Sequence, residues 1–380
     1  MSKKTSKNKG TVVIFSILCL VIGIIAGFGG LTYYFLPLTE NLEISGTYYS
    51  KKPISNTTIS LEESNISVHF LELGNKYTGD CTYIKTDTCD ILIDCGSKAS
   101  SIPYVTNYLN QYVTDGTLEY VIVTHAHQDH YAGFATSENV DSIFDLYKCE
   151  NIIDFAQTNQ KSSSSLYKNY IRERQQAING GANHYTALDC INNTNGATSE
   201  FNIGTNITLT ILNSYFYSHS ATTENNYSVC SLISFEDKNF LFTGDLEEIG
   251  EQHLVEMNNL PQVDLYKAGH HGSKTSSSDT LMSVVRPKTI CVCCCAGSPE
   301  YTSVNNNQFP TQIFIDIVSK YTEEIYVTTL CVNYNNNEFT SFNGNIIYMC
   351  NTNGYSVNCS NNNTILKDSE WFKSNRVWNN

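Results

Sequence analysis

The sequence predicts one large α+β domain that follows a single N-terminal transmembrane helix. Three observations support this prediction: a long uncharged apolar run near the N-terminus, an alternation of short apolar segments with helix-like segments after it, and polar clusters directly at the ends of several apolar segments. The 380 residues, of which 41% are hydrophobic and 16% are charged, favour a globular body over a disordered chain or a repeat array.

The N-terminal segment has the features of a membrane anchor. Four lysines in residues 1–10 precede residues 10–39, which contain no charged side chain. A spanning helix needs roughly 20 apolar residues, and basic residues mark its cytoplasmic side. We therefore predict a basic cytoplasmic tail at 1–10, a single-pass anchor in the cell membrane at 11–36, and a C-terminal domain outside the cell. A cleaved signal peptide is the alternative, but the apolar run is long for one.

Beyond the anchor, the sequence divides into a linker, a folded domain and a tail. Residues 37–65 are polar and lack a sustained period, which indicates a linker; 66–350 contain the periodic segments; 351–380 begin with an Asn/Ser-rich stretch typical of surface hairpins or frayed chain. Helices are predicted at 165–179 and 246–257. Strands are predicted at 66–73, 82–85, 90–94, 120–124, 207–212, 229–235, 239–243, 263–267, 289–293 and 325–329.

The charge of the domain restricts its partners. Four of the 23 basic residues lie in the N-terminal tail, whereas all 37 acidic residues come after it, so the exported body is strongly acidic. Proteins that bind nucleic acid non-specifically usually have a basic surface. A nucleic acid substrate would therefore need a local basic groove or contacts dominated by metal ions.

The cysteine content favours free thiols over a disulfide framework. One of the 14 cysteines lies in the apolar run, and the thirteen that follow cannot pair completely. The Cys-x-x-Cys spacing of Cys291 and Cys294 falls inside a predicted buried strand and has no second pair, which argues against a zinc knuckle. Small apolar packing explains these cysteines better.

The strongest chemical signal is a cluster of imidazoles and carboxylates directly after the strand that ends near residue 124. His125, His127, Asp129 and His130 fall within six residues. Divalent metals of borderline softness prefer imidazole nitrogen and carboxylate oxygen, and a strand that turns into a helix can direct alternate side chains at one point. Metal binding is a better explanation of this cluster than chance or helix capping.

Two further segments end strands with candidate ligands. Asp245 follows an apolar strand and a glycine, where the carboxylate could bridge two cations. His270 and His271 follow another strand, and because adjacent residues point to opposite sides, only one of them is expected to face the metal. We predict His270 as that ligand and assign His271 to substrate or leaving-group positioning.

In their order and spacing these motifs resemble the metallo-β-lactamase superfamily and, within it, the extracellular β-lactamase-like domain of ComEC-type DNA-uptake proteins. The first strands, 68–71 and 92–96, are also similar to that family. The matching motifs are His-x-His-x-Asp-His at 125–130, Asn-Asn-x-Ser at 225–228, Thr-Gly-Asp at 243–245 and His-His-Gly-Ser-Lys at 270–274.

The resemblance implies a four-layer αββα sandwich with two divalent metal ions, for which zinc is favoured over manganese. By the family's pattern, His125, His127 and Asp245 bind one ion, and Asp129, His130, Asp245 and His270 bind the other. The expected catalytic residues are Asp129, which orients the attacking water, His271 and Lys274. Lys274 is close in sequence to His270, where it either contacts an anionic substrate oxygen or is a solvated surface lysine.

The chain departs from the wider superfamily at the first metal site. Many members supply a ligand histidine between the histidine cluster and the Gly-Asp, but here only His184 and His219 lie there, outside any motif. The ComEC-like pattern has Asn and Ser instead, so Asn226 or Ser228 is the alternative candidate to complete this site. The family's early Gly-x-Gly-Asp turn is also stretched, at 74–80.

The expected function is a metal-dependent hydrolase held at the membrane by its N-terminal helix, with an anionic substrate such as DNA or a small phosphodiester. An ester, lactone or β-lactam hydrolase is the alternative within the enzyme class. A non-catalytic, metal-binding sensor module is the alternative of another class, although retention of all six candidate ligands argues against a decayed site.

Overall fold

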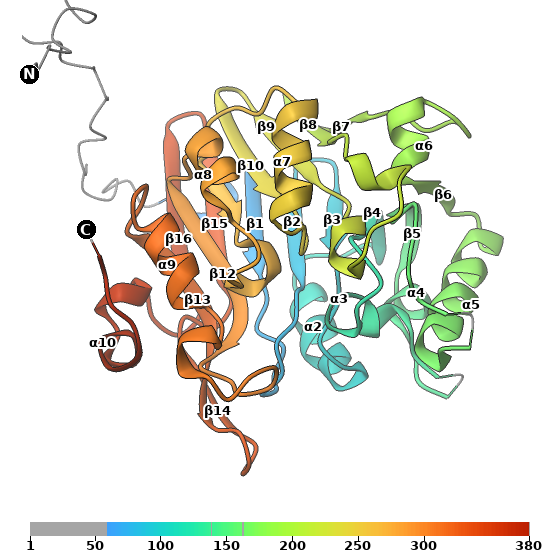
Figure 1. The fold of residues 1–380 in the computed structure, drawn as a ribbon. Coiled ribbons are helices and arrows are strands. Elements are labelled where there is room, and N and C mark those ends of the chain that lie inside the picture. The colour runs from blue at the N-terminus through green and yellow to red at the C-terminus, as the bar shows by residue number, and fades with distance from the viewer. Residues whose placement is uncertain (1–58, 138, 162, 380) are drawn as a thin grey trace, which may run out of the picture. The chain divides into compact units, whose positions relative to one another are not determined.

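Two eight-stranded β-sheets, packed face to face, form the body of the protein in the computed structural model, which describes residues 59–137, 139–161 and 163–379 (Figure 1). In order of neighbouring strands, the first sheet contains β16 (Gly354–Cys359), β15 (Ile346–Asn351), β1 (Ile66–Phe70), β2 (Thr82–Thr86), β3 (Asp90–Ile93), β4 (Thr117–Val123), β5 (Lys148–Asp154) and β6 (Asn183–Thr186). The second contains β14 (Glu338–Ser341), β13 (Glu324–Asn333), β12 (Thr289–Ala296), β11 (Leu265–Lys267), β10 (Lys238–Phe242), β9 (Ser231–Phe235), β8 (Ile207–Ile211) and β7 (Glu200–Gly204).

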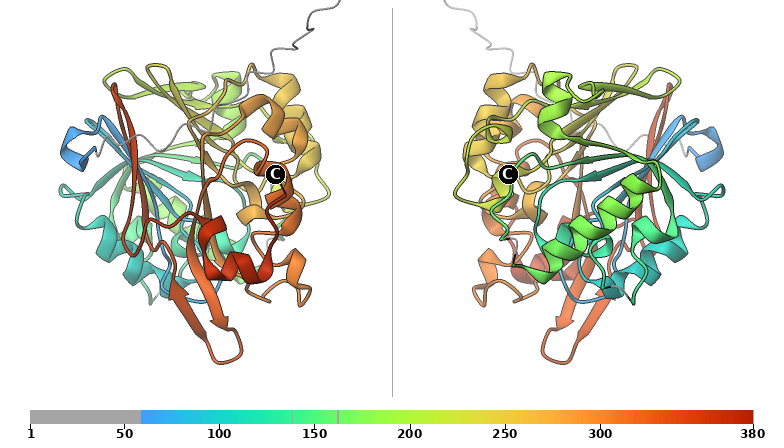
Figure 2. Two further views of the ribbon diagram at one scale, coloured as in Figure 1. Left: turned by 90° about the vertical axis from the view of Figure 1, so that its left-hand side faces the viewer. Right: turned by 90° about the vertical axis from the view of Figure 1, so that its right-hand side faces the viewer.

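Helices lie on the outer sides of the two sheets. Figure 2 shows α2 outside the first sheet, and α7, α8 and α9 together outside the second. This arrangement confirms the predicted two-sheet α+β fold. The helices are α2 (Ile102–Leu109), α3 (Gln128–Tyr131), α4 (Ile143–Leu146), α5 (Ser165–Asn179), α6 (Ala187–Asn192), α7 (Glu248–Met257), α8 (Asp279–Val285), α9 (Gln312–Val318) and α10 (Glu370–Asn375).

The second sheet is apolar on both faces, because it separates two hydrophobic cores. In β10, Phe240 and Phe242 belong to the core that also contains the first sheet, whereas Leu241 belongs to the core formed with α7, α8 and α9. Side chains alternate between the two faces of a strand, so a strand buried on both sides is a continuous apolar run. The same alternation places Cys291 and Cys293 in one core and Cys294 in the other.

The cysteines act as small core side chains throughout the described part of the chain. All thirteen cysteines there are free, and eleven of them are buried. Burial raises the pKa of the Cys149 thiol to about 12, which keeps it protonated and unreactive at neutral pH. This agrees with the packing role inferred from the sequence.

Parallel strands bring the candidate ligands to one edge of each sheet. β3 runs parallel to β4, and β10 runs parallel to β11, so the carboxyl ends of these neighbours lie side by side. The loops that follow these four strands contain most of the polar motifs found in the sequence. Because the sheets face each other, these loops form one polar cluster at a shared edge.

All ten predicted strands are present, and the predicted helix at 165–179 coincides with α5. The second predicted helix begins later, since α7 starts at Glu248. The sequence pattern did not reveal β5, β6, β7, β14, β15 or β16 as separate strands. These are mostly edge strands, whose mixed polar and apolar residues resemble loops.

The predicted domain limits differ from the extent of the fold. The limit at residue 350 falls inside the hairpin of β15 and β16, which pair along their whole length. The predicted linker includes Ile59, which is buried and whose backbone N–H bonds the Ser356 hydroxyl at 3.2 Å. The predicted anchor at 11–36 lies outside the described residues. Within residues 59–379 as described, no helix is long and apolar enough to cross a membrane.

Candidate metal centre

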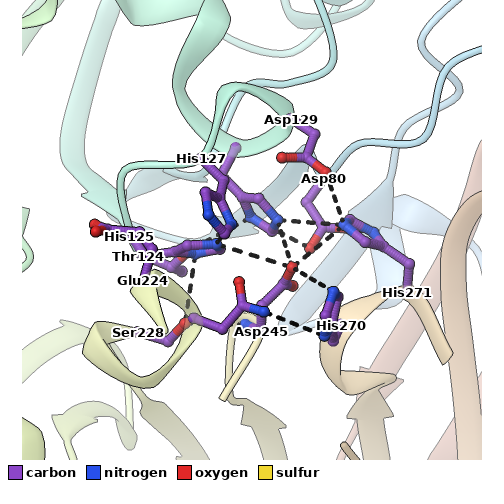
Figure 3. A network of polar contacts seen from close by, with 12 residues as sticks. Asp80, Thr124, His125, His127, Asp129, Glu224, Ser228, Asp245, His270 and His271 are labelled. Carbon is purple, nitrogen blue, oxygen red and sulfur yellow. Dashed lines mark hydrogen bonds and ion pairs between the residues drawn. The ribbon is translucent and has the colours of Figure 1, made fainter. Parts of the chain in front are cut away.

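The polar cluster consists of loops from both sheets whose side chains point towards one another. Figure 3 shows residues of the loop after β4 facing Asp245, which follows β10, and His270 and His271, which follow β11. Asp80, two residues before the start of β2, faces the same point. Side chains separated by up to 191 positions in the sequence therefore meet in one place.

Asp245 lies at the centre of the cluster. Its Oδ2 is 3.1 Å from His130 Nε2, 3.5 Å from His271 Nε2 and 3.9 Å from His125 Nε2. The backbone N–H of Asp245 donates to the Ser228 hydroxyl at 3.0 Å. Gly244 has a positive φ of 54°, and a Cβ there would come within 2.9 Å of the Ser228 side chain, so this close approach requires glycine.

His125 and His127 form the second half of the cluster. His125 Nε2 faces His127 Nδ1 at 3.1 Å, and the other nitrogen of His125 lies 3.1 Å from the Thr124 hydroxyl. Thr124 donates its own hydroxyl to Asp94, so its oxygen accepts the proton of His125 Nδ1. Burial lowers the pKa of His125 well below 6.5, and the neighbouring His130 lowers it further. His125 therefore presents a neutral Nε2 lone pair to the cluster.

His130 and His271 face each other through atoms that both have lone pairs. His130 Nδ1 is held by Asp94 Oδ2 at 2.8 Å, and His271 Nδ1 is held by the Cys293 carbonyl at 2.9 Å. Each Nδ1 therefore has the proton and each Nε2 has the lone pair. The two Nε2 atoms are only 3.3 Å apart. Two lone pairs at this distance need a cation between them, either a proton or a metal ion.

The electrostatics of the cluster favour a cation. Burial alone would lower the pKa of both His130 and His271, but nearby carboxylates reverse the shift. The charges of Asp245 and Asp94 raise the pKa of His130 well above 6.5, and those of Asp245 and Asp80 raise the pKa of His271 to about 10. The negative potential that stabilises a proton here also attracts a divalent ion.

The donor set fits divalent metal ions. Asp80, His130, Asp245 and His271 each offer one ligand atom, all within 4.8 Å of one another and all buried. The buried oxygens Asp80 Oδ1, Asp80 Oδ2 and Asp245 Oδ1 make no hydrogen bond of normal geometry. A buried carboxylate oxygen without a hydrogen bond is costly unless a cation lies close to it, either an ammonium such as that of Lys267 beside Asp80 or a metal ion. A mixed imidazole and carboxylate set of this kind suits zinc or manganese.

The structure places His271 rather than the predicted His270 in the buried donor set. His271 is buried, whereas the His270 side chain is 21% exposed and its Nε2 lies 3.9 Å from Asp245. His270 Nδ1 instead lies 3.1 Å from the Thr275 hydroxyl. Both histidines have positive φ, 47° and 55°, so the alternation of an extended strand does not apply to them. The prediction of His270 assumed an extended strand, and the backbone at these two residues is left-handed instead.

Lys267 and Asp80 add a buried ion pair beside the donor set. Lys267, the last residue of β11, pairs with Asp80 and lies 3.9 Å from Asp245 Oδ1. Burial would lower the pKa of Lys267, but the charges of Asp80 and Asp245 raise it, so the ammonium stays charged. Neither Asp80 nor Lys267 was singled out in the sequence. Asp80 ends the stretched glycine turn at 74–80, which was the available signal.

Asp129 lies on the more open side of the cluster. Its side chain is 18% exposed, and its Oδ2 is 3.5 Å from His271 Nε2. The Tyr301 hydroxyl donates to the same oxygen at 2.8 Å. Burial would raise the pKa of Asp129, but its neighbours, His271 above all, lower the pKa below its usual value. This carboxylate is therefore ionised. Asp129 is thus available to a water or a substrate that approaches from solvent.

Glu224 is a further residue that sequence reasoning missed. Its Oε1 accepts from the backbone N–H of Ala126 at 3.2 Å, and Gln160 Nε2 donates to the Ala126 carbonyl at 2.8 Å. The peptide between His125 and His127 is therefore held on both sides. Glu224 directly precedes the Asn-Asn-x-Ser motif, and only the fold brings it to the histidine loop.

The four candidates for completing the first metal site have different partners in the structure, and of these Ser228 lies against a histidine of the cluster. The Ser228 hydroxyl is 3.4 Å from His125 Nδ1, at the rim of the cluster. Asn226 instead accepts from the backbone N–H of Glu247. His184 pairs with Asp154 at 2.9 Å, and His219 stacks on Tyr215. Both histidines thus have partners outside the cluster.

Lys274, predicted to contact the substrate, is exposed and lies three residues after His271. Its neighbours Ser273 and Thr275 bond to each other at 3.1 Å and to His270, so the backbone at this point is fixed. Lys274 is therefore close to the cluster in sequence, but among the described residues it makes no hydrogen bond or ion pair with a candidate ligand. Its catalytic role stays a prediction.

Comparisons with known proteins match the part of the chain that contains the histidine loop. Residues 74–138 match the family model described as the metallo-beta-lactamase superfamily, a range that includes Asp80, Asp94 and the loop from His125 to His130. "Recombination protein 2" of Haemophilus influenzae is 41% identical over 64 residues, and "ComE operon protein 3" of Bacillus subtilis is 38% identical over 68 residues. Each match covers 17% of this chain and 8% of the relative.

Solved structures with a similar fold are more distant in sequence. The metallo-beta-lactamase fold protein YhfI of Bacillus subtilis is 12% identical with a TM-score of 0.39, and the similarity covers 69% of this chain and 95% of that one. The short form of human tRNase Z is 14% identical with a TM-score of 0.33, over 60% of this chain and 92% of that one.

Proposed function

Because the chain contains a metallo-beta-lactamase superfamily domain, we propose that it is a metal-dependent hydrolase that cleaves phosphodiesters at a dinuclear centre. The observation on which this rests is the pair of His130 and His271, whose Nε2 lone pairs lie 3.3 Å apart beside the Asp245 carboxylate. Two imidazole nitrogens beside a carboxylate are suited to a divalent ion. Members of the superfamily are mostly hydrolases.

The residues divide between two adjacent ion positions that share Asp245. His125, His127 and Asp245 would hold one ion, with the Ser228 hydroxyl at its rim. Asp129, His130, Asp245 and His271 would hold the other, with Asp80 next to it. Divalent ions at such a site supply Lewis acidity and lower the pKa of water towards neutrality. We favour zinc over manganese, because the set contains several imidazoles.

The chain's own groups orient the ligands and manage the proton. Asp94 and the Cys293 carbonyl fix the tautomers of His130 and His271, so their Nε2 atoms stay available. Asp129, on the open side, is the group that orients the attacking water and accepts its proton. Lys267 neutralises part of the carboxylate charge without leaving the buried interior.

The substrate class follows from the resemblance to ComEC-type domains together with the charge of the site. A cluster that binds cations next to the hydroxyl of the exposed Tyr301 suits an anionic oxygen of a phosphodiester. The whole chain has a net charge of −14, and its four N-terminal lysines lie outside the domain, so the domain is strongly acidic. This charge argues for a small diester or a short strand over a long duplex. We further propose that the N-terminal segment anchors the enzyme in the cell membrane with this domain outside.

The test combines metal analysis with a screen of substrates on the purified full-length protein. We expect bound zinc or manganese and hydrolysis of bis-p-nitrophenyl phosphate or single-stranded DNA. Hydrolysis of p-nitrophenyl acetate or nitrocefin alone would replace the phosphodiesterase with an ester or lactam hydrolase. Metal binding without turnover of any of the four compounds would indicate a sensor module.

Two variants test the assignment of the residues. We expect His127→Ala and Asp245→Ala to lower kcat by at least about 1,000-fold, a barrier increase of about 4 kcal/mol, while circular dichroism shows an intact fold. Both side chains touch the cluster and contribute little to the apolar cores. Wild-type rates in either variant would contradict the proposed centre.

A further inference from the structure

The loop between β12 and α9 places one tyrosine at the mouth of the site. Tyr301 is 57% exposed, yet its hydroxyl donates to Asp129 Oδ2 at 2.8 Å. Asp129 is the most accessible carboxylate of the cluster, whereas His130, Asp245 and His271 lie buried beneath it. A substrate that reaches the cluster from the side of Asp129 therefore meets the phenol first.

The loop is fixed at its base, so the position of Tyr301 is defined. The backbone N–H of Gly297 bonds the Phe309 carbonyl at 2.9 Å, which closes the loop. Buried Arg376, from the segment after α10, donates to the Pro310 carbonyl at 2.9 Å. The ring of Tyr301 packs on Phe309, with centroids 5.6 Å apart.

A second contact ties this loop to the one that contains Asp80. Glu300 Oε2 accepts from the backbone N–H of Thr78 at 2.9 Å. Thr78 is two residues before Asp80, so the loops from the two sheets are joined directly beside the donor set. Tyr301 is held between this junction and Phe309, with its hydroxyl directed at the cluster.

We propose that Tyr301 is a catalytic residue that donates a hydrogen bond to an unesterified phosphoryl oxygen of the substrate in the transition state. This inference rests on the proposed function. In the reaction, the water oxygen forms a bond to phosphorus, the bond to the leaving alcohol oxygen breaks, and that oxygen leaves with the electron pair. The proton taken from water by Asp129 ends on the leaving alcohol.

Tyr301 keeps its own proton throughout. When the substrate is absent, its hydroxyl donates to Asp129. As negative charge grows on the phosphoryl oxygens, the hydroxyl turns to the oxygen that faces it. A donor that bonds the phosphoryl oxygen only as charge develops stabilises the transition state more than the ground state, and loss of one such donor costs about 100-fold in rate.

The test is Tyr301→Phe, which removes the hydroxyl and keeps the ring on Phe309. With bis-p-nitrophenyl phosphate we expect kcat to fall about 100-fold with a KM change of less than about threefold. We expect the inhibition constant of orthovanadate, which mimics the trigonal bipyramidal transition state, to rise by a similar factor. Metal content and metal affinity should stay at wild-type values. Tyr104→Phe, at an exposed tyrosine outside the cluster, is the matched control and should behave as wild type.

Four other results would each contradict at least one part of the proposal. If the wild type cleaves the diester and Tyr301→Phe is equally active, the inference about Tyr301 is wrong and the proposed function stands. If Tyr301→Phe loses metal affinity, the residue positions Asp129 and does not contact the substrate. If the loss in kcat grows with the pKa of the leaving alcohol, Tyr301 assists the leaving group instead of the phosphoryl oxygen. A wild type that cleaves no phosphodiester overturns both proposals.

Discussion

His130 Nε2 and His271 Nε2 lie 3.3 Å apart, although the two residues are separated by 141 positions in the chain. The distance results from two different sheets, because His130 follows β4 of the first sheet and His271 follows β11 of the second. Each ring is fixed by a hydrogen bond to its Nδ1, so neither can rotate away without losing a buried contact. This pair gives the candidate centre its most specific predictions.

Metal binding by variants of the two histidines tests whether His271 or His270 is the ligand. We expect His271→Asn to lower the affinity for zinc or manganese by at least about 100-fold, because it removes a ligand atom from the buried set. His270→Asn, the matched control, should lower it by no more than about tenfold. Isothermal titration of the metal-free proteins with each metal measures both. A larger loss in His270→Asn would restore the sequence-based assignment.

Glu224 is expected to position the two histidines of the loop after β4. Glu224→Gln replaces one carboxylate oxygen with an NH₂ group. The side chain can then no longer accept all three hydrogen bonds that Ala126, Thr158 and Asn159 donate to Glu224. We expect about a tenfold loss of metal affinity, the usual scale for a residue that supports a ligand.

The readout for Glu224 includes more than activity. Hydrogen exchange of the Ala126 amide should accelerate in Glu224→Gln, because its acceptor is lost or weakened. Glu200→Gln, at an exposed glutamate at the start of β7, is the control and should change neither quantity. Unchanged exchange at Ala126 would show that Glu224 does not hold this peptide.

The buried pair of Lys267 and Asp80 predicts a variant that depends on metal for stability. Lys267→Met leaves Asp80 and Asp245 without their ammonium, and removal of one partner of a buried ion pair costs about 3 to 5 kcal/mol. Zinc or manganese chloride should therefore raise the melting temperature of Lys267→Met more than that of the wild type. Differential scanning calorimetry with and without metal gives the comparison.

Lys85→Met is the matched control for this experiment. Lys85 pairs with Asp90 at 2.9 Å, but its side chain is 40% exposed, so its loss should cost less than about 1 kcal/mol and should not respond to metal. A variant Lys267→Met as stable as the wild type without metal would contradict the charge balance inferred for the site.

His69 predicts how stability depends on pH away from the metal centre. His69 Nδ1 lies 2.7 Å from the Tyr108 hydroxyl and Nε2 lies 2.8 Å from the Ser67 hydroxyl. Burial, with a smaller effect of Lys85, lowers the pKa of His69 to about 3. The unfolded chain therefore binds a proton below pH 6.5 that the folded protein does not. This contribution to stability is complete above pH 6.5 and is lost as the pH falls towards 3.

The comparison of wild type with His69→Gln isolates this group, because glutamine can bond both hydroxyls but does not titrate. Between pH 7.5 and 5.5 the wild type should lose about 1 kcal/mol of unfolding free energy relative to the variant. Urea unfolding at the two pH values measures the difference. A constant difference between the two proteins would show that His69 titrates normally in the folded state.

The sequence by itself determined ten of the sixteen described strands, the α5 helix and the loops that contain His125 to His130, Asp245 and the two adjacent histidines. These features are local, because the period of apolar side chains fixes a strand and the order of residues within a loop fixes which ligands are available. The resemblance to the metallo-β-lactamase superfamily followed from the same local motifs, and the family model matches residues 74–138. The anchor predicted at 11–36 is a local feature too, and it stays a prediction.

Only the tertiary structure decided which of these residues meet. His271 lies in the buried donor set and His270 at its partly exposed side, and strand alternation could not predict this because both residues have a left-handed backbone. Asp80, Lys267 and Tyr301 joined the site because the two sheets bring the ends of β11 and β12 against the loops after β1 and β4. Glu224 joined it from the segment between β8 and β9, which lies against the loop after β4. None of these four residues belongs to a recognisable motif. Their places in the site depend on contacts between residues 98 to 187 positions apart, which only packing can specify.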